Sequence, residues 1–338
     1  MLKALRSHHG PDEEVPEVEE SVLDQFLSTR TSAQPGRQLR LPVLEICSEN
    51  TGAGKTQLLY YIVANGVLPE IHGSTILDGK SGSVIFIDTD GRFNVDRLVQ
   101  VMQYYIESKK NEEDTMDGID QLIERSLQHV HVFQPRTMSS FLETLSSLRD
   151  YLFEPSAHVS SNRAVNSIVI DSASAFYWDT RAALETERIN ALDAKAPGAS
   201  AASMPPPKPN PYALLVNRLR AQQQIFSCAV IIASTATKHR NPNTGEENIR
   251  TLPAPWQTFP TTRLMVRRDH VRKFVVGIAW EEAEKDKLLR QAAVDQGHFV
   301  ASSMSAGLDF KFAITKDGVR ILDDRKEGED GEMVMEED

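Results

Sequence analysis

The sequence predicts an α/β protein with a mostly parallel central sheet flanked by helices and an antiparallel extension at the C-terminal end. Three observations support this fold class. Apolar strand-like runs alternate with helical patterns from residue 41 onward, a glycine-rich loop separates the first strand from the first helix, and helical patterns become rare near the C-terminus. A chain of 338 residues, 40% hydrophobic and 25% charged, is typical of ordinary globular proteins and excludes collagen-like and wholly disordered classes.

The elements follow the order strand, helix, strand that builds βαβ units. Such units bury both faces of a parallel sheet, which explains strand-like runs that are apolar throughout. The predicted strands are 43–47, 84–88, 130–133, 168–171 and 229–233, and the predicted helices are 56–65, 95–107, 141–153 and 214–226. The antiparallel extension is predicted from strand-like runs at 263–267, 274–279, 310–314 and 319–322, with one helix at 281–294.

The predicted domain organisation is one large core with polar ends. We expect a polar N-terminal arm at 1–40, a core at 41–322, a disordered insertion rich in proline and alanine at 196–211, and an acidic disordered tail at 323–338.

The arm contains one short helical pattern, in which Val18, Val22 and Phe26 recur at four-residue spacing. A small partner-docking helix and a weakly ordered arm both account for this pattern, and the sequence leaves the two open.

The net charge of −11 mainly reflects the ends of the chain. Residues 323–338 carry nine acidic and two basic residues, whereas residues 237–273 carry eight basic and three acidic residues, so an anion-binding surface is expected to use the latter stretch.

The longest apolar run, 228–233, is far shorter than the roughly 18 residues of a membrane span, so no transmembrane helix is expected. The two cysteines, Cys47 and Cys228, lie in apolar runs, which favours a reducing compartment without disulfides.

The strongest motif is a glycine-rich loop that ends in Lys55 and Thr56. Its glycines allow a tight turn whose N–H groups point at a phosphate, and the following helix adds its positive dipole end. In such a loop the lysine reaches the β- and γ-phosphates and the threonine hydroxyl binds Mg²⁺. Glu49 replaces the first glycine of the pattern Gly-x-x-x-x-Gly-Lys-Thr, and a glycine-rich turn with a coincidental Lys-Thr pair is the alternative. The predicted nucleotide-binding residues are Thr51, Gly52, Ala53, Gly54, Lys55, Thr56 and Gln57.

Two carboxylates follow predicted strands. Asp171 ends the apolar strand 168–171, at the position where P-loop proteins hold Mg²⁺, and the alternative is an aspartate that caps the next turn. Asp90 follows the strand 84–88 and could act as a general base on an attacking water, with a solvated Asp-Gly turn as the alternative. The predicted catalytic residues are Lys55, Asp90 and Asp171, and the predicted metal ligands are Thr56 and Asp171.

Four blocks of this sequence, in one order, resemble the RecA/Rad family of recombinases. The blocks are the glycine-rich loop, residues 84–93, residues 168–178 and residues 261–264, and the resemblance covers roughly residues 41–322. Within this family, the phrases Phe-Ile-Asp-Thr-Asp and Asp-Ser-x-Ser-Ala-Phe-Tyr-Trp most resemble a eukaryotic recombinase paralogue.

The resemblance implies a RecA-like P-loop ATPase core that binds ATP and Mg²⁺. By position, Lys55 and Thr56 are the Walker A pair, Asp171 is the Walker B carboxylate, and Asp90 takes the place of the catalytic glutamate. Asp90 is one methylene shorter than that glutamate, which weakens proton transfer. Two further departures are Ala236 at the position of a glutamine sensor, and Phe26-Leu27-Ser28-Thr29, which does not match the Phe-x-x-Ala self-assembly motif. We therefore expect an ATP binder with weak or no hydrolysis.

The resemblance also implies two loops that approach DNA. The first would begin at 177–181 and continue through the insertion, and the second would run from after residue 237 to about residue 259. Basic side chains there would contact phosphates, and Trp178 or Trp256 would offer a stacking face unless it packs against the core. The residues predicted to contact DNA are Trp178, Arg181, Lys238, Arg240 and Arg250.

The function implied by the resemblance is that of a nuclear recombinase paralogue in homologous recombination and double-strand-break repair, working as a subunit of a mediator complex. Its expected partners are other recombinase paralogues and single-stranded or branched DNA, which it would reach directly or through the complex. No membrane association is expected. An active DNA-stimulated ATPase that remodels or pairs strands is the alternative. An unrelated P-loop kinase is more remote, because no substrate-binding lid is visible in the sequence.

Overall fold

The computed structural model describes residues 41–110, 118–193, 209–240, 247–269, 277, 279–304 and 309–322. The arm at 1–40, most of the insertion expected at 196–211 and the tail at 323–338 therefore lie outside the described residues, as does most of the strand expected at 274–279.

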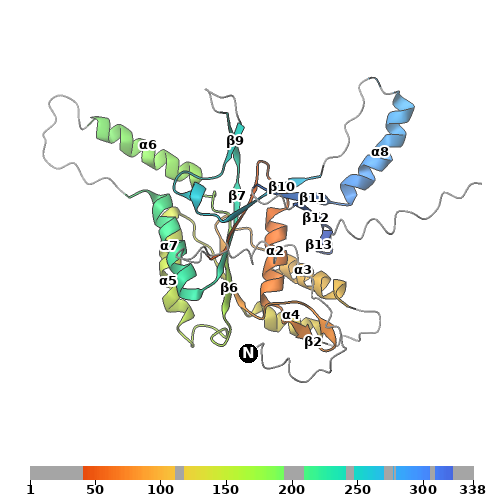
Figure 1. Ribbon diagram of the computed structural model, residues 1–338, viewed down its shortest axis with the longest axis horizontal. Coiled ribbons are helices and arrows are strands. Elements are labelled where there is room, and N and C mark those ends of the chain that lie inside the picture. The colour runs from red at the N-terminus through yellow and green to blue at the C-terminus, as the bar shows by residue number, and fades with distance from the viewer. Residues whose placement is uncertain are drawn as a thin grey trace, which may run out of the picture.

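The centre of the fold is a nine-stranded sheet (Figure 1). Its strands are β1 (Val43–Ser48), β4 (Ser83–Asp88), β5 (Val130–Phe133), β6 (Val165–Asp171), β7 (Ala229–Thr235), β10 (Thr262–Arg268), β11 (His298–Ser303), β12 (Asp309–Ile314) and β13 (Val319–Leu322). The order is β13-β12-β11-β10-β1-β7-β6-β4-β5. The strands from β10 to β5 in this order pair in parallel, and β11, β12 and β13 pair antiparallel. The predicted fold class is thereby confirmed. The strand expected at 263–267 differs from the prediction, because β10 pairs in parallel with β1 and the antiparallel extension begins only at β11.

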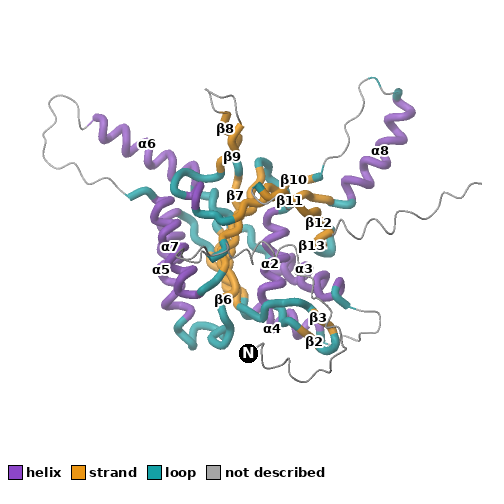
Figure 2. The backbone as a smooth tube through the Cα atoms, in the orientation of Figure 1, coloured by secondary structure: helices purple, strands orange, loops and turns teal. Residues whose placement is uncertain are grey.

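Helices cover both faces of the sheet (Figure 2). They are α2 (Lys55–Val67), α3 (Val95–Ser108), α4 (Ile119–Leu127), α5 (Met138–Leu152), α6 (Tyr177–Asp193), α7 (Pro211–Phe226) and α8 (Trp280–Asp295). One face packs against α2, α3 and α4, and the other packs against α5 and α7. Figure 2 shows α6 and α8 extending away from the sheet. In the described part of the chain, no helix combines the length and apolar character needed to cross a membrane.

Short elements complete the described chain. A small hairpin pairs β2 (Ile71–His72) with β3 (Thr75–Ile76), a second pairs β8 (Thr237–Arg240) with β9 (Glu247–Arg250), and the 3₁₀ helix η1 (Trp256–Thr258) precedes β10.

Side chains of each central strand alternate between the two halves of the core. In β4, Val84 and Phe86 pack in the cluster that includes α2 and α3, whereas Ile85 and Ile87 pack in the cluster that includes α5 and α7. Every residue of this strand is buried, because helices lie on both faces. The strand therefore contains a run of consecutive apolar residues. It lacks the alternation of polar and apolar residues that is typical of a half-exposed strand.

Several elements differ from the prediction. The sequence pattern missed α4, α6 and β11, and α6 has no apolar stripe that would reveal a helix, because most of its described side chains are exposed. α7 begins at Pro211, so the insertion expected to extend to residue 211 ends earlier. Asn210 Oδ1 accepts a hydrogen bond from Tyr212 N at 2.9 Å, and proline is well tolerated at the first helical position.

Candidate functional site

The glycine-rich turn joins β1 to α2 at the carboxyl edge of the parallel strands. Gly52 and Gly54 have φ angles of +73° and +89°, a region that side chains with a Cβ atom rarely adopt. A Cβ at Gly54 would lie 2.7 Å from Ile314 Cδ1, whereas a Cβ at Gly52 would meet nothing within 4 Å. α2 begins at Lys55 without a side-chain cap and without an acidic residue in its first turn. Its first N–H groups and its positive dipole end are therefore suited to an anion.

Lys55 is held at the end of β1. Its Nζ atom donates to Ser48 Oγ at 2.5 Å, and Ser48 Oγ donates to the Asn50 carbonyl at 2.7 Å. Burial lowers the pKa of the Lys55 ammonium, while the nearby carboxylates of Asp171 and Asp90 act in the opposite direction. A partly buried cation at this place is favourable for binding phosphate oxygens.

The two predicted metal ligands are in direct contact. Thr56 Oγ1 donates a hydrogen bond to Asp171 Oδ2 at 2.7 Å, which joins the first turn of α2 to the last residue of β6. Burial raises the pKa of the Asp171 carboxyl, and the hydrogen bond from Thr56 opposes this shift.

The donor set at this contact fits one hard cation. Within the described ranges, no group of three or more His, Cys, Asp or Glu side chains could hold a metal without other ligands. A threonine hydroxyl and a carboxylate are the oxygen ligands that Mg²⁺ uses when phosphates and water complete its coordination. Thr56 and Asp171 therefore suit a metal that arrives with a nucleotide.

The two aspartates at the end of β4 lie in different surroundings. Asp88 accepts hydrogen bonds from the backbone N–H groups of Arg92 and Phe93, at 3.1 and 3.0 Å, and stabilises the turn that leads to α3. Asp90 is exposed at the surface, yet partial desolvation raises the pKa of its carboxyl, and the charges of Arg92 and, to a smaller extent, Lys55 act against this shift. The three predicted catalytic residues therefore gather at one edge of the sheet. The role of Asp90 as a base remains a prediction.

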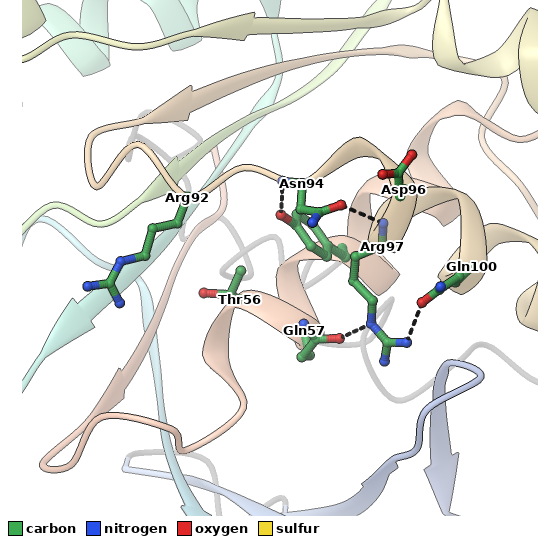
Figure 3. A pocket seen from close by; sticks show the side chains of 8 residues that line it. Thr56, Gln57, Arg92, Asn94, Asp96, Arg97 and Gln100 are labelled. Atoms are coloured by element: carbon green, nitrogen blue, oxygen red, sulfur yellow. Dashed lines mark hydrogen bonds between the residues drawn. The ribbon is translucent and has the colours of Figure 1, made fainter.

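A pocket of ≈ 380 Å³ adjoins Thr56 (Figure 3). The guanidinium of Arg97 is restrained beside it: Nε donates to Gln57 Oε1 at 2.8 Å, and Nη1 donates to Gln100 Oε1 at 3.0 Å. The other hydrogen bonds of the guanidinium go to the carbonyls of Thr315 and Lys316, in the turn between β12 and β13. The lining residues are Thr56, Gln57, Tyr60, Arg92, Asn94, Asp96, Arg97 and Gln100.

Sequence reasoning had assigned only Thr56 and Gln57 of this pocket to the site. No motif identifies Arg97, because its partners come from segments that are far apart in the chain. A guanidinium fixed by four hydrogen bonds presents a planar cationic surface, on which an aromatic ring can stack.

The segment expected to open the first DNA loop is helical. Trp178 and Arg181 lie in the first turns of α6, so the prediction of a loop at 177–181 is wrong. The Trp178 side chain is 67% exposed, and the Arg181 guanidinium carbon lies 5.5 Å from the centroid of its ring. The two residues form an exposed aromatic and cationic surface.

The segment expected to form the second DNA loop is largely ordered. β8 and β9 form a hairpin in which Lys238 pairs with Ile249 and Thr237 pairs with Arg250, whose side chain is exposed. Arg240 ends β8. Trp256 is fully buried and donates from Nε1 to Glu45 Oε1 at 2.8 Å, so it offers no stacking face to DNA.

The sheet order and the residues gathered at its carboxyl edge define a RecA-like α/β core. No family model matches the chain. Among curated proteins, DNA repair protein XRCC2 from Mus musculus is 31% identical over 130 residues, which are 38% of this chain and 39% of the relative. DNA repair protein RAD51 homolog 3 from Cricetulus griseus is 29% identical over 136 residues, which are 38% of this chain and 33% of the relative.

A third relative gives a longer alignment. The DNA repair protein XRCC2 homolog from Arabidopsis thaliana is 24% identical over 273 residues, which are 67% of this chain and 68% of the relative. The chain thus matches less than half the length of the first two relatives. The resemblance to recombinase paralogues, and to XRCC2 in particular, is confirmed.

Proposed function

We propose that the protein is an ATP-binding recombinase paralogue that acts in homologous recombination and double-strand-break repair in the nucleus, as a subunit of a mediator complex with other recombinase paralogues. The hydrogen bond of 2.7 Å between Thr56 and Asp171 carries this proposal, because it joins the hydroxyl of a glycine-rich loop to a strand-ending carboxylate. Three relatives whose names describe DNA repair proteins support the biological setting.

In this proposal, different residues of the chain bind different parts of the nucleotide. The amides from Thr51 to Thr56 hold the phosphates, and Lys55 adds a positive charge. Thr56 and Asp171 hold Mg²⁺, which neutralises charge on the phosphate oxygens. The adjoining pocket leaves room for the base, and Arg97 offers it a planar face.

Slow or absent hydrolysis is part of the proposal. The short carboxylate of Asp90 reaches less far toward an attacking water than a glutamate would. Ala236 is 3% exposed, and its methyl group cannot relay the state of a phosphate to the β8–β9 hairpin. The mechanism would then be docking, in which bound nucleotide holds the core in a shape that partners recognise.

One observation favours the second candidate, a DNA-stimulated ATPase. The raised pKa of the Asp90 carboxyl makes it a stronger base than an ordinary surface aspartate. Turnover measured with and without single-stranded DNA separates the candidates. Strong stimulated hydrolysis that is lost in Lys55→Ala supports the ATPase, whereas a wild-type protein that binds Mg-ATP and shows no turnover with DNA supports the docking subunit.

Calorimetry with Mg-ATP tests nucleotide binding. We expect Lys55→Ala and Asp171→Asn to weaken binding at least roughly tenfold, since each removes a charge that faces the phosphates or the metal. Lys110→Ala, at an exposed position outside the site, is the control and should bind as wild type does. Absence of heat with the wild-type protein, or equal binding by all variants, would contradict the proposal.

DNA contact by α6 is tested by titrating single-stranded DNA at several salt concentrations. We expect Trp178→Ala to lower affinity by removing a stacking surface, and Arg181→Ala to lower both affinity and its salt dependence. Trp280→Ala removes an aromatic side chain that is 78% exposed on α8 and serves as the control. Unchanged affinity in both α6 variants would assign DNA contact to another surface or to a partner subunit.

A further inference from the structure

An exposed apolar patch lies at the amino edge of the sheet, where α5 and α7 end. It consists of Phe153, Ile225 and Phe226, and we refer to it as the helix-end patch. Phe153 is 64% exposed, Ile225 is 41% exposed, and the ring centroids of Phe153 and Phe226 are 6.1 Å apart. The two rings lie close enough to leave a shared apolar surface in water, and Ile225 adds an exposed apolar side chain at the same end of α7. Grouped apolar side chains indicate a contact site more strongly than scattered ones do.

The first described residues of the chain lie near the end of α7 that carries this patch. The carbonyl of Pro42, immediately before β1, accepts hydrogen bonds from Val230 N and from Gln223 Nε2, both at 3.1 Å. Gln223 belongs to the last turns of α7, two positions before Ile225. The chain that precedes β1 is therefore attached to the same end of α7 that carries the patch.

The arm carries an apolar stripe that suits such a surface. Val18, Val22 and Phe26 recur at four-residue spacing and would share one side of a helix, with acidic residues between them. The 14 residues from 27 to 40 can extend to roughly 45–50 Å, which is ample for a return to the helix-end patch. A tether of this length also gives an intramolecular contact a high effective concentration.

A second apolar pair provides a comparison. Ile71 and Ile76 face each other across the β2–β3 hairpin and are 57% and 56% exposed. This hairpin follows α2, which covers the opposite face of the sheet from α7. The hydrogen bond from Gln223 ties the entry of the arm to the α7 side.

We propose that residues 18–26 of this chain dock on the helix-end patch of the same molecule, with Phe26 packed against Phe153 and Ile225. This contact would cover the exposed rings and fix the course of the arm into β1. It does not depend on nucleotide or DNA binding.

Cysteine trapping in the full chain tests the contact, because both native cysteines are buried. We expect the pair Val22→Cys and Ile225→Cys to form an intramolecular disulfide roughly tenfold faster than the control pair Val22→Cys and Ile71→Cys. Equal rates for the two pairs would overturn the proposal. An intermolecular disulfide whose yield rises with protein concentration would also overturn it, and would assign the patch to a second copy.

Hydrogen exchange gives a second readout that does not require cysteines. In the full chain, Phe26→Asp should make the amides near the ends of α5 and α7 exchange several-fold faster, and Phe153→Asp should do the same for residues 18–26. Ile71→Asp is the matched control and should change neither segment. If each substitution affects only its own surroundings, the arm and the patch are not in contact and the proposal fails.

Discussion

At Gly54, two constraints act on one residue. Its φ angle of +89° lies in the left-handed region, and a Cβ would be 2.7 Å from Ile314 Cδ1 and 3.3 Å from a carbon of Phe299. Gly52, at +73°, shares the first constraint only, because its surroundings are open. The two glycines therefore separate the effect of backbone conformation from the effect of crowding.

Alanine substitution tests this separation. We expect Gly54→Ala to lower the free energy of unfolding by about 2–4 kcal/mol, because left-handed strain and overpacking add, and Gly52→Ala to lower it by about 1–2 kcal/mol through strain alone. Urea denaturation measures both values. Equal losses would show that Ile314 moves aside without cost.

Two buried histidines, His129 and His131, share a buried serine. His129 Nδ1 lies 2.8 Å from Ser160 Oγ, His131 Nε2 lies 2.9 Å from the same atom, and His131 Nδ1 lies 3.0 Å from the Tyr151 hydroxyl. Burial lowers the pKa of His131 to about 4, with smaller contributions from His158 and His129. The cluster is thus a neutral hydrogen-bonded group in the folded protein.

This cluster makes stability depend on pH. The folded pKa of about 4 lies below the ordinary value of 6.5, so the unfolded chain binds a proton that the folded chain excludes. The contribution of His131 to the free energy of unfolding is therefore complete above pH 6.5 and is lost as the pH falls from 6.5 toward 4. This loss amounts to roughly 1–3 kcal/mol after allowance for solvent screening. His131→Gln should reduce this pH dependence in urea denaturation. His72→Gln is the control, and an equal pH dependence in the two variants would contradict the explanation.

Among the elements, η1 is joined to the sheet by buried polar contacts. Glu45 in β1 is fully buried; its Oε1 accepts hydrogen bonds from Trp256 Nε1 and Ser234 Oγ, both at 2.8 Å, and its Oε2 pairs with Arg263 Nε at 2.6 Å. These bonds connect β1, β7 and β10 to the segment that follows the β8–β9 hairpin. They explain why this segment is ordered where a loop was expected.

Removal of one donor tests this connection. Trp256→Phe keeps an aromatic ring but leaves the buried carboxylate of Glu45 with one hydrogen bond fewer, so we expect the free energy of unfolding to fall by about 2–4 kcal/mol. Trp280→Phe, at a side chain 78% exposed, should change it by less than about 0.5 kcal/mol. A similar small change in both variants would show that packing, and not the bond to Glu45, holds η1.

At the scale of the whole molecule, Arg97 links the first half of the chain to the last strands. It bonds to Gln57 in α2 and to the carbonyls of Thr315 and Lys316 between β12 and β13. The same residue lines the pocket beside Thr56. A ligand bound there would therefore contact a residue that joins α2 to the turn between β12 and β13.

Ligand binding at this place should stabilise the entire fold. With Mg-ATP at 100 times its dissociation constant, we expect a gain of about 2.7 kcal/mol, because the nucleotide binds the folded state alone. Asp171→Asn should lose about half of this gain or more at the same nucleotide concentration, because its binding is at least roughly tenfold weaker. Thermal unfolding with and without Mg-ATP measures the effect, and an equal gain in wild type and variant would exclude Asp171 from the site.

Helices and strands were predictable from the sequence where their own residues show a clear apolar pattern. β4 and the second half of β6 were visible because burial on both faces makes a strand segment apolar, and α5 was visible because one side of it is apolar. α6 was missed because a helix exposed on nearly all sides carries no periodic signal. β11 was missed because it mixes apolar and small polar residues.

The same distinction applies to the candidate site. Lys55, Thr56 and Asp171 were identifiable, because glycine turns and strand-ending carboxylates are defined by neighbours in the sequence. Amino-acid order alone was thus enough for the parallel core and for the residues expected to hold phosphate and metal. Arg97, the burial of Trp256 and the position of the helix-end patch required the folded chain, because each depends on contacts between segments that sequence spacing does not relate.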